Sequence, residues 1–421
     1  MTKVTIIGGG WSGCAAAIAA KKLGAEVQLI ERTDLLLGLG NVGGIMRNNG
    51  RFTAAEEHIA MGGEELFAIT DACATHKNVE FPGHHHASLY DVHKVEPAVR
   101  HLLEEMGITV RFTTRIVDVA KKEKRIVSIT SAEREVFEAD VFVDCTGTTG
   151  PMGNCMEFGN GCSMCVLRCP AFGPRVSISA KAGGTDYYGY RADGTPGAFS
   201  GSCKLRKNSL STEIRKDLDE HGVCLIPLPK QFVHKGKLSQ KVCRQYALPP
   251  FAENLVLLDT GEVKMMTSFL PLAELRQIPG MEKAEFVDPY AGGKGNSIRY
   301  MAITERDQYM RVRHTENLFC GGEKAGPYIG HTEAIITGTL AGYNAASYAS
   351  GKPLFNPADV PEPTATGAFL TYEKTDGGMF TFAGDAFFDH LTERGLYTTE
   401  REEIRRRIDK AGLTGRYNSF I

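Results

Sequence analysis

The sequence predicts an α/β fold, and three observations support this prediction. A short β-rich run at residues 4–7 leads into a glycine-rich turn and a helix of small residues. A similar unit stands towards the other end, where residues 318–320 lead into a glycine-rich loop and a second helix of small residues. Several short alternating runs between them are typical of strands. Hydrophobic residues make up 42% of the 421 positions, which excludes a chain that is disordered throughout.

The first unit has the layout of a dinucleotide-binding motif. In order it comprises a strand, a glycine turn, a helix, a second strand and an acid, at residues 4–7, 8–13, 14–24, 26–30 and Glu31. Gly8, Gly10 and Gly13 fit the pattern G-x-G-x-x-G, which permits a tight turn and close backbone approach to a pyrophosphate. The free N–H groups at the helix start attract phosphates, and Glu31 is placed to bond a ribose. The unit predicts a Rossmann-type domain.

Residues 109–144 predict further strands. An alternating run, a charged turn and three short strands follow one another, at residues 109–119, 121–125, 126–130, 135–137 and 139–144. The last strand leads into Thr146-Gly147. This return to a strand that ends in Thr-Gly resembles the layout of flavoproteins with two dinucleotide-binding sites. By that resemblance, Thr146 and Gly147 lie near the adenosine end of a bound FAD.

The C-terminal unit completes the resemblance. A strand at residues 318–320 runs into Gly321-Gly322-Glu323, and a helix begins at about His331. A helix start aimed at the pyrimidine edge of a flavin could stabilise the negative charge of its reduced form. This segment resembles the closing FAD motif of the glucose-inhibited division protein A family. It is most similar to the folate-dependent tRNA uridine methyltransferase branch. Residues 276–286 and 365–370 resemble the segments of the family that precede and follow this motif.

The resemblance covers residues 1–150 and 265–375 and implies a protein that depends on FAD. The flavin would lie between the N-terminal motif and the helix at His331. The implied cofactor-binding residues are Gly8, Gly10, Gly13, Glu31, Arg32, Gly43, Gly44, Thr146, Gly147, Gly322, Glu323, Gly330, His331 and Thr332. Gly43 and Gly44 suit a backbone that passes close to the flavin, although a simple loop would also explain them.

Four of the eleven cysteines lie close together, as Cys155-x6-Cys162-x2-Cys165-x3-Cys169-Pro170. Four thiolates can hold the irons of a 4Fe-4S cluster, and a proline after the last ligand resembles the end of a bacterial ferredoxin motif. A zinc site, a redox disulfide and ordinary buried cysteines remain alternatives. Substitute ligands could come from Cys145, Cys203, Cys224 or Cys243. The methyltransferases of the related branch are not iron–sulfur proteins by their general pattern, and their catalytic cysteine pair is not located here.

The charge pattern bears on partners. The formal net charge of −2 argues against a chain that coats nucleic acid. Residues 204–244 nevertheless hold ten Lys or Arg and four acids, so this segment could face RNA, an acidic electron carrier or an anionic substrate, or form a solvated surface. Three histidines at residues 84–86 are not expected to bind a metal, because adjacent strand residues point to opposite faces and cannot all converge on one ion. They are expected in a loop near the substrate or the surface. Arg306, Arg311 and Arg313 are explained most simply by ion pairs with Glu305 and Asp307.

The sequence thus predicts an FAD-binding Rossmann-type domain at residues 1–150 and 300–350. An α+β substrate domain that carries the 4Fe-4S motif is inserted at residues 151–299, and a linker and helical cap follow at residues 351–421. The predicted function is an oxidoreductase that passes electrons between cluster, flavin and an unidentified substrate or a redox protein such as a ferredoxin-like donor. A uridine methyltransferase acting on tRNA or rRNA and a non-catalytic redox carrier or sensor are the alternatives. The odd cysteine total, the lack of spaced cysteine pairs and the dense cysteine cluster predict a cytoplasmic protein. The lack of an uncharged apolar run of about 18 residues predicts that no membrane span is present, and a homodimer is compatible with the sequence.

Overall fold

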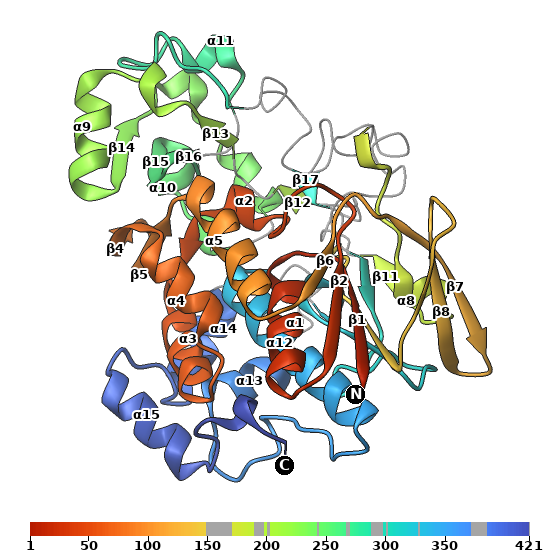
Figure 1. The fold of residues 1–421 in the computed structure, drawn as a ribbon. Helices are drawn as coiled ribbons and strands as arrows, with labels where there is room; N and C mark the ends of the chain where they lie inside the picture. The colour runs from red at the N-terminus through yellow and green to blue at the C-terminus, as the bar shows by residue number, and fades with distance from the viewer. Residues whose placement is uncertain are drawn as a thin grey trace.

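The computed structural model is drawn in Figure 1. It describes residues 1–148, 171–188, 198–199, 203–241, 244–266, 270–287, 298–299, 302–326, 329–371 and 385–420. In this part of the chain no helix is both long and apolar enough to span a lipid bilayer.

A parallel sheet forms the centre of the molecule. Its order is β19-β10-β1-β2-β6, with bounds Leu318–Cys320, Val141–Asp144, Lys3–Ile7, Glu26–Ile30 and Thr109–Arg111. Ile6 of β1 stands opposite Val143 of β10 and Leu29 of β2, and all three side chains are fully buried. Parallel sheets covered on both faces need such apolar strands. The predicted α/β fold with a Rossmann-like sheet is confirmed, and the sheet joins strands from both ends of the chain.

Two helices of small residues pack against each other on this sheet (Figure 1). Helix α1 spans Trp11–Lys22 and helix α12 spans His331–Ala349. The sequence predicts the first helix only from residue 14, but its first turn already includes the end of the glycine motif, because Gly10 is the N-cap. The predicted start of the second helix at His331 agrees with the structure.

A second, antiparallel sheet builds the upper lobe of Figure 1. Its order is β13-β16-β15-β14, with bounds Cys203–Leu205, Glu262–Met265, Asn254–Thr260 and Val223–Pro227. One face forms an apolar cluster that includes α9 (Thr212–His221). The other face packs on the hairpin of β4 (Ala74–Phe81) and β5 (His84–Tyr90).

The other strands and α-helices complete the described fold. The remaining strands are β3 (Ile45–Met46), β7 (Ile116–Lys122), β8 (Arg125–Ser131), β9 (Val136–Glu138), β11 (Asp186–Tyr188), β12 (Ala198–Phe199), β17 (Ile298–Arg299) and β18 (Ala302–Thr304). The remaining α-helices are α2 (Gly40–Gly43), α3 (Gly50–Ala60), α4 (Glu65–Ala72), α5 (Val92–Glu105), α8 (Ile178–Lys181), α10 (Pro250–Glu253), α11 (Leu272–Leu275), α13 (Ala365–Thr371), α14 (Asp385–Glu393) and α15 (Arg401–Lys410). The helix expected around residues 401–410 is therefore present.

Two local predictions are wrong. The alternating run at residues 109–119 is not one strand, because β6 joins the central sheet whereas β7 starts a separate antiparallel meander. The histidines at residues 84–86 lie on β5 instead of in a loop. The ring of His84 is stacked between Phe81 and Tyr246, with both centroid distances 4.4 Å. Burial lowers the pKa of His84 to about 3, so it is a neutral core residue.

A buried carboxylate joins the C-terminal region to the dinucleotide-binding part. Glu57 of α3 is fully buried, and its two oxygens accept hydrogen bonds from the backbone N–H groups of Ala365 (2.9 Å) and Thr366 (2.8 Å). Backbone N–H groups at the start of a helix have no acceptor within the helix, and negative charge is favoured there. The Glu57 carboxylate supplies this acceptor at the start of α13. Arg407 of α15 approaches the same carboxylate at 3.8 Å.

The Glu57→Ala variant tests this connection. It leaves two buried N–H groups without their acceptor, and we expect the free energy of unfolding to fall by about 2–4 kcal/mol in urea denaturation. Glu104→Ala, which removes an exposed acid of α5, is the control and should stay within about 0.5 kcal/mol of the parent protein. Equal stability of the two variants would contradict the capping role.

Candidate functional site

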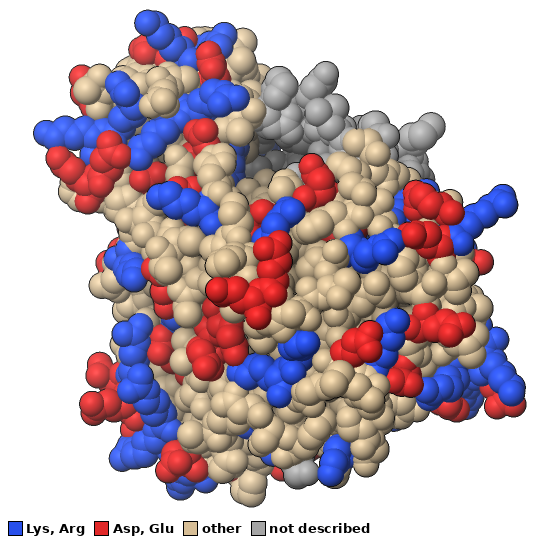
Figure 2. Space-filling view, viewed as in Figure 1, with Lys and Arg blue, Asp and Glu red and all other residues tan. Residues whose placement is uncertain are grey.

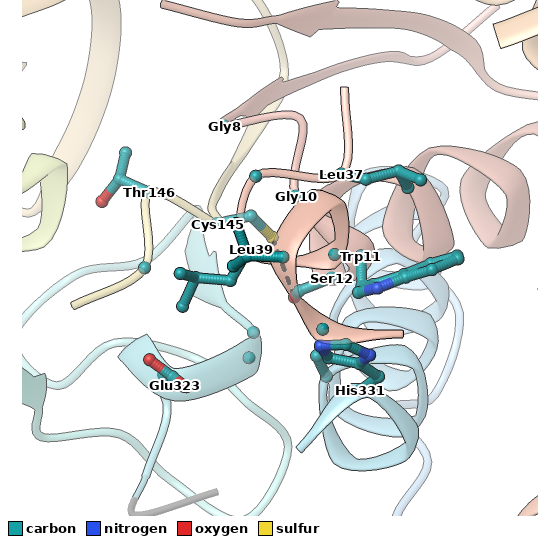
Figure 3. A pocket seen from close by; sticks show the side chains of 18 of the residues that line it. Gly8, Gly10, Trp11, Ser12, Leu37, Leu39, Cys145, Thr146, Glu323 and His331 are labelled. Atoms are coloured by element: carbon teal, nitrogen blue, oxygen red, sulfur yellow. Dashed lines mark hydrogen bonds between the residues drawn. The ribbon is translucent and has the colours of Figure 1, made fainter. Parts of the chain in front are cut away.

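A deep pocket lies at the carboxyl ends of the central strands (Figure 3). The residues that end or follow four of these strands line it: Gly8 after β1, Glu31 after β2, Cys145 after β10 and Gly321 after β19. The first turns of both α1 and α12 also contribute to its wall. Ligands of open α/β sheets bind at this edge, where helix N-termini present free N–H groups.

The structure places most of the predicted cofactor residues around this one pocket. Those that line it are Gly8, Gly10, Glu31, Arg32, Gly43, Thr146, Gly147, Gly322, Glu323, Gly330, His331 and Thr332. Gly13 and Gly44 stand behind the wall instead. A Cβ atom on Gly13 would lie 1.8 Å from the carbonyl oxygen of Gly8, and one on Gly44 would lie 2.4 Å from the Thr260 side chain. These two glycines allow close packing, and Gly13 thereby permits the turn itself.

Glu31 shapes the loop at one end of the pocket. One of its carboxylate oxygens accepts a hydrogen bond from the backbone N–H of Gly9 (2.7 Å), and the other accepts one from that of Thr33 (2.7 Å). The acid therefore binds the glycine turn to the strand beside it. Its predicted contact with a ribose stays a prediction.

Asp144, at the end of β10, was not identified from the sequence as a site residue. One of its oxygens accepts hydrogen bonds from the backbone N–H (3.0 Å) and hydroxyl (2.6 Å) of Thr146. The other accepts bonds from the N–H and hydroxyl of Ser179. Because Asp144 is fully buried, these four donors replace its hydration and fix the turn that carries Thr146 and Gly147.

The C-terminal motif is held by its own helix. The N–H of Gly322 donates to the hydroxyl of Thr337 in α12 (2.8 Å), and the carboxylate of Glu323 accepts a hydrogen bond from Thr148 (2.8 Å). Near the start of α12, Arg51 of α3 donates to Glu333 (2.7 Å). Both ends of the chain are thus fixed to the same pocket wall.

Aromatic side chains surround His331 at the start of α12. The Nδ1 atom of His331 lies 3.0 Å from the hydroxyl of Tyr90, which donates to the carbonyl oxygen of Gly40 (2.8 Å). The Trp11 ring lies 6.1 Å from that of Tyr90 and 6.0 Å from that of His331. Figure 3 shows Trp11 and His331 side by side in the pocket.

Several pocket residues were missed from the sequence. They are Trp11, Arg51, Arg175, Tyr246 and Lys264, which line the pocket, and Tyr90 directly behind it. Trp11 alone carried a local signal, because it stands inside the glycine motif. The others come from separate elements, and the pairing of those elements brings them to the pocket.

The described cysteines show no cluster. Cys145 lies in the main apolar core, whereas Cys203 and Cys224 lie in the core of the upper lobe. Burial raises the pKa of both Cys145 and Cys224 to about 12, which keeps these thiols protonated. In the part of the chain that the structure describes, no group of three or more metal-ligating residues is found. The predicted ligands Cys155, Cys162, Cys165 and Cys169, and also Cys243, lie outside the described residues.

The pocket fits an elongated dinucleotide such as FAD. It extends from the loop at Glu31 past two helix N-termini to His331, and glycines leave room for close approach of a pyrophosphate. Gly8, Gly10 and the first turn of α1 would hold the phosphates. The start of α12 would lie at the flavin end.

Comparison with protein families agrees with this geometry. Residues 3–150 match the family model described as FAD dependent oxidoreductase. Residues 258–353 match the model described as glucose inhibited division protein A. The two segments contribute the two walls of the pocket described above.

Solved structures show the same fold. The form II crystal structure of GidA from Aquifex aeolicus has a TM-score of 0.62 and 15% identity, covering 97% of this chain and 76% of that one. The form I structure gives a TM-score of 0.60 at 15% identity, covering 97% and 78%. At 15% identity these structures show a shared fold, whereas the family models relate residues 3–150 to FAD dependent oxidoreductases and residues 258–353 to glucose inhibited division protein A.

The Gly13→Ala variant tests the glycine turn. The added methyl group would overlap the Gly8 carbonyl, so we expect FAD affinity to fall by at least about tenfold as the turn is displaced. Flavin absorbance per chain and FAD titration of the stripped protein measure this effect. Gly236→Ala is the control, because a Cβ atom there meets no heavy atom within 4 Å. Unchanged FAD binding in Gly13→Ala would place the dinucleotide elsewhere.

Proposed function

We propose that this protein is an FAD- and 4Fe-4S-dependent oxidoreductase that passes electrons between the cluster, the flavin and a substrate or protein partner. The observation that supports it best is that segments from both ends of the chain build one pocket, with the starts of α1 and α12 in its wall. When bound, FAD supplies two-electron and one-electron chemistry. The protein supplies positioning and electrostatics.

Different residues of the chain would bind and position different parts of FAD along the pocket. The start of α1 provides N–H groups and a positive helix end for the phosphates. Asp144 keeps the Thr146 turn in place, and Glu31 holds the glycine loop. At the other end, the start of α12 favours negative charge, and His331 and Lys264 line the space beside it.

The position of the cysteine-rich sequence supports a role beside this pocket. Cys155 stands eight residues after Gly147, and Cys169 stands six residues before Arg175. Both Gly147 and Arg175 line the pocket. In chain order the cysteine-rich sequence therefore stands between two segments that contribute to the pocket wall. In this proposal, a cluster held by that sequence exchanges electrons with the flavin.

The redox partner could be a substrate or an acidic, ferredoxin-like protein. Figure 2 shows Lys and Arg beside Asp and Glu on the lobe that carries α9 and β14. Several basic residues of the segment 204–244 are engaged by acids, in the pairs Lys207–Asp219, Lys216–Glu220 and Lys235–Glu253. This pairing reduces the positive surface that is offered to an anionic partner.

A uridine methyltransferase acting on tRNA or rRNA is the second candidate, favoured by the match of residues 258–353 to the GidA model. Two features argue against an RNA substrate: the ion pairs that reduce the positive surface of residues 204–244, and the cysteine-rich sequence, which is not typical of the methyltransferase branch. A non-catalytic redox carrier or sensor is the third. A cluster that cannot reduce the flavin within the protein, combined with tight binding of a partner, would favour the third over the first.

Metal analysis of the Cys165→Ser variant tests the cluster. We expect anaerobically purified protein to contain iron and sulfide with its flavin, and the variant to lose most of both, because each thiolate completes the coordination of one iron. The control is Cys73→Ser, a partly buried cysteine on the described fold, which should keep its iron. Stoichiometric zinc, or flavin without iron in the parent protein, would contradict the proposal.

RNA retention at low salt separates the second candidate from the first. Phosphate contacts are strongest at low ionic strength, so an RNA-modifying enzyme should retain tRNA there and release it as salt rises. We expect no salt-dependent retention of tRNA or of an rRNA fragment in a filter-binding titration. Retention that Lys230→Glu and Lys237→Glu weaken would instead support the methyltransferase.

A further inference from the structure

We infer that the side-chain amide of Asn48 binds the pyrimidine edge of the flavin ring and thereby raises the reduction potential of the bound FAD. The inference rests on the proposed function, because it needs FAD in the pocket. Asn48 lines that pocket, and only 3% of the residue is exposed. Within the described chain, its Nδ2 atom is covered and has no hydrogen-bond acceptor.

The residues on either side of Asn48 place it at the start of α12. Two positions before it, the thioether of Met46 accepts a hydrogen bond from the hydroxyl of Thr332 (3.5 Å). Three positions after it, Arg51 donates to Glu333 (2.7 Å). Thr332 and Glu333 belong to the first turn of α12. Asn48 therefore lies at the end of the pocket that is proposed for the flavin ring.

The unpaired amide indicates a partner that joins it when the pocket is filled. Buried polar groups of folded proteins are nearly always hydrogen-bonded, and a buried N–H without an acceptor is costly. Among the described residues, no hydrogen bond to Oδ1 of Asn48 is found either, so none holds the amide in one orientation. The two ends of an amide are similar in size, and a half-turn about the Cβ–Cγ bond exchanges them. That turn moves the N–H groups away from the covered side.

An amide is chemically complementary to the pyrimidine edge of a flavin. This edge carries two carbonyl oxygens and one N–H group, whereas an amide offers N–H donors and one carbonyl acceptor. Reduction of a flavin places negative charge on the same edge, so N–H donors beside it stabilise the reduced form more than the oxidised form. The amide of Asn48 acts there together with the positive end of α12. Both raise the potential.

Two variants of Asn48 test this contact. Asn48→Ala removes the amide, and we expect FAD to bind the stripped protein about threefold to tenfold more weakly, which corresponds to the loss of one hydrogen bond. The flavin potential, measured by reductive titration against a reference dye, should fall in Asn48→Ala. It should fall further in Asn48→Asp, because a carboxylate repels the negative charge of the reduced ring.

Asn356→Ala is the matched control. Asn356 is 4% exposed and stands outside the pocket lining, and its amide is paired. Its Nδ2 donates to Asp359 (3.2 Å), and its Oδ1 accepts the N–H of Ala358 (3.1 Å). We expect this variant to lower the melting temperature without changing FAD affinity or potential. Asn48→Ala should show the opposite pattern, because flavin-free protein loses no hydrogen bond with its amide.

The outcomes are distinct. Unchanged FAD affinity and potential in both Asn48 variants overturn the inference, and so does a fall in potential that Asn356→Ala reproduces. If Asn48→Ala does not fold, Asn48→Asp, which keeps the size of the side chain, decides by its potential. A parent protein that binds no FAD overturns the inference together with the proposed function, whereas flavin without iron contradicts the proposed function alone.

Discussion

The close contact between α1 and α12 is the constraint on which the rest of the structure depends. A Cβ atom on Gly338 would lie 2.2 Å from the Ser12 carbonyl oxygen, and one on Gly342 would lie 2.1 Å from that of Ala16. Only glycines allow the two backbones to approach so closely. Because both helices then begin at the same edge of the sheet, their positive ends act on one pocket.

The upper lobe reaches this pocket through a short helix. Gly43, at the end of α2, lies against His331 of α12, and Gly44 lies against Thr260 of β15. Lys264 of β16 donates to the carbonyl oxygen of Val42 (2.8 Å), which anchors the sheet to α2. Two residues that line the pocket, Lys264 of β16 and His331 of α12, therefore both contact the short helix α2.

The sequence predicts the parts whose signals are local. The strand, turn and helix units at both ends could be recognised because glycine spacing and apolar runs have direct backbone consequences. Arg51 and Tyr90 could not be placed in this way. They reach the site only because α3 and β5 pack beside α12, and no pattern within either element indicates this. The division of residues 109–119 into two strands could not be predicted for the same reason, because neighbouring strands of similar composition belong to different sheets.

Trp11 shows how the site differs from a generic dinucleotide turn. An indole inside a glycine motif needs space, and the structure supplies it at Gly40, where a Cβ atom would lie 2.5 Å from the indole nitrogen. A bulky residue inside a glycine motif departs from the usual sequence pattern, and the absence of a side chain at Gly40 compensates for it; such departures are expected at functional sites. The compensation couples the two ends of the pocket, because the carbonyl oxygen of Gly40 accepts the hydroxyl of Tyr90. The turn that receives the phosphates and the histidine beside the flavin end thus share one packed group of side chains.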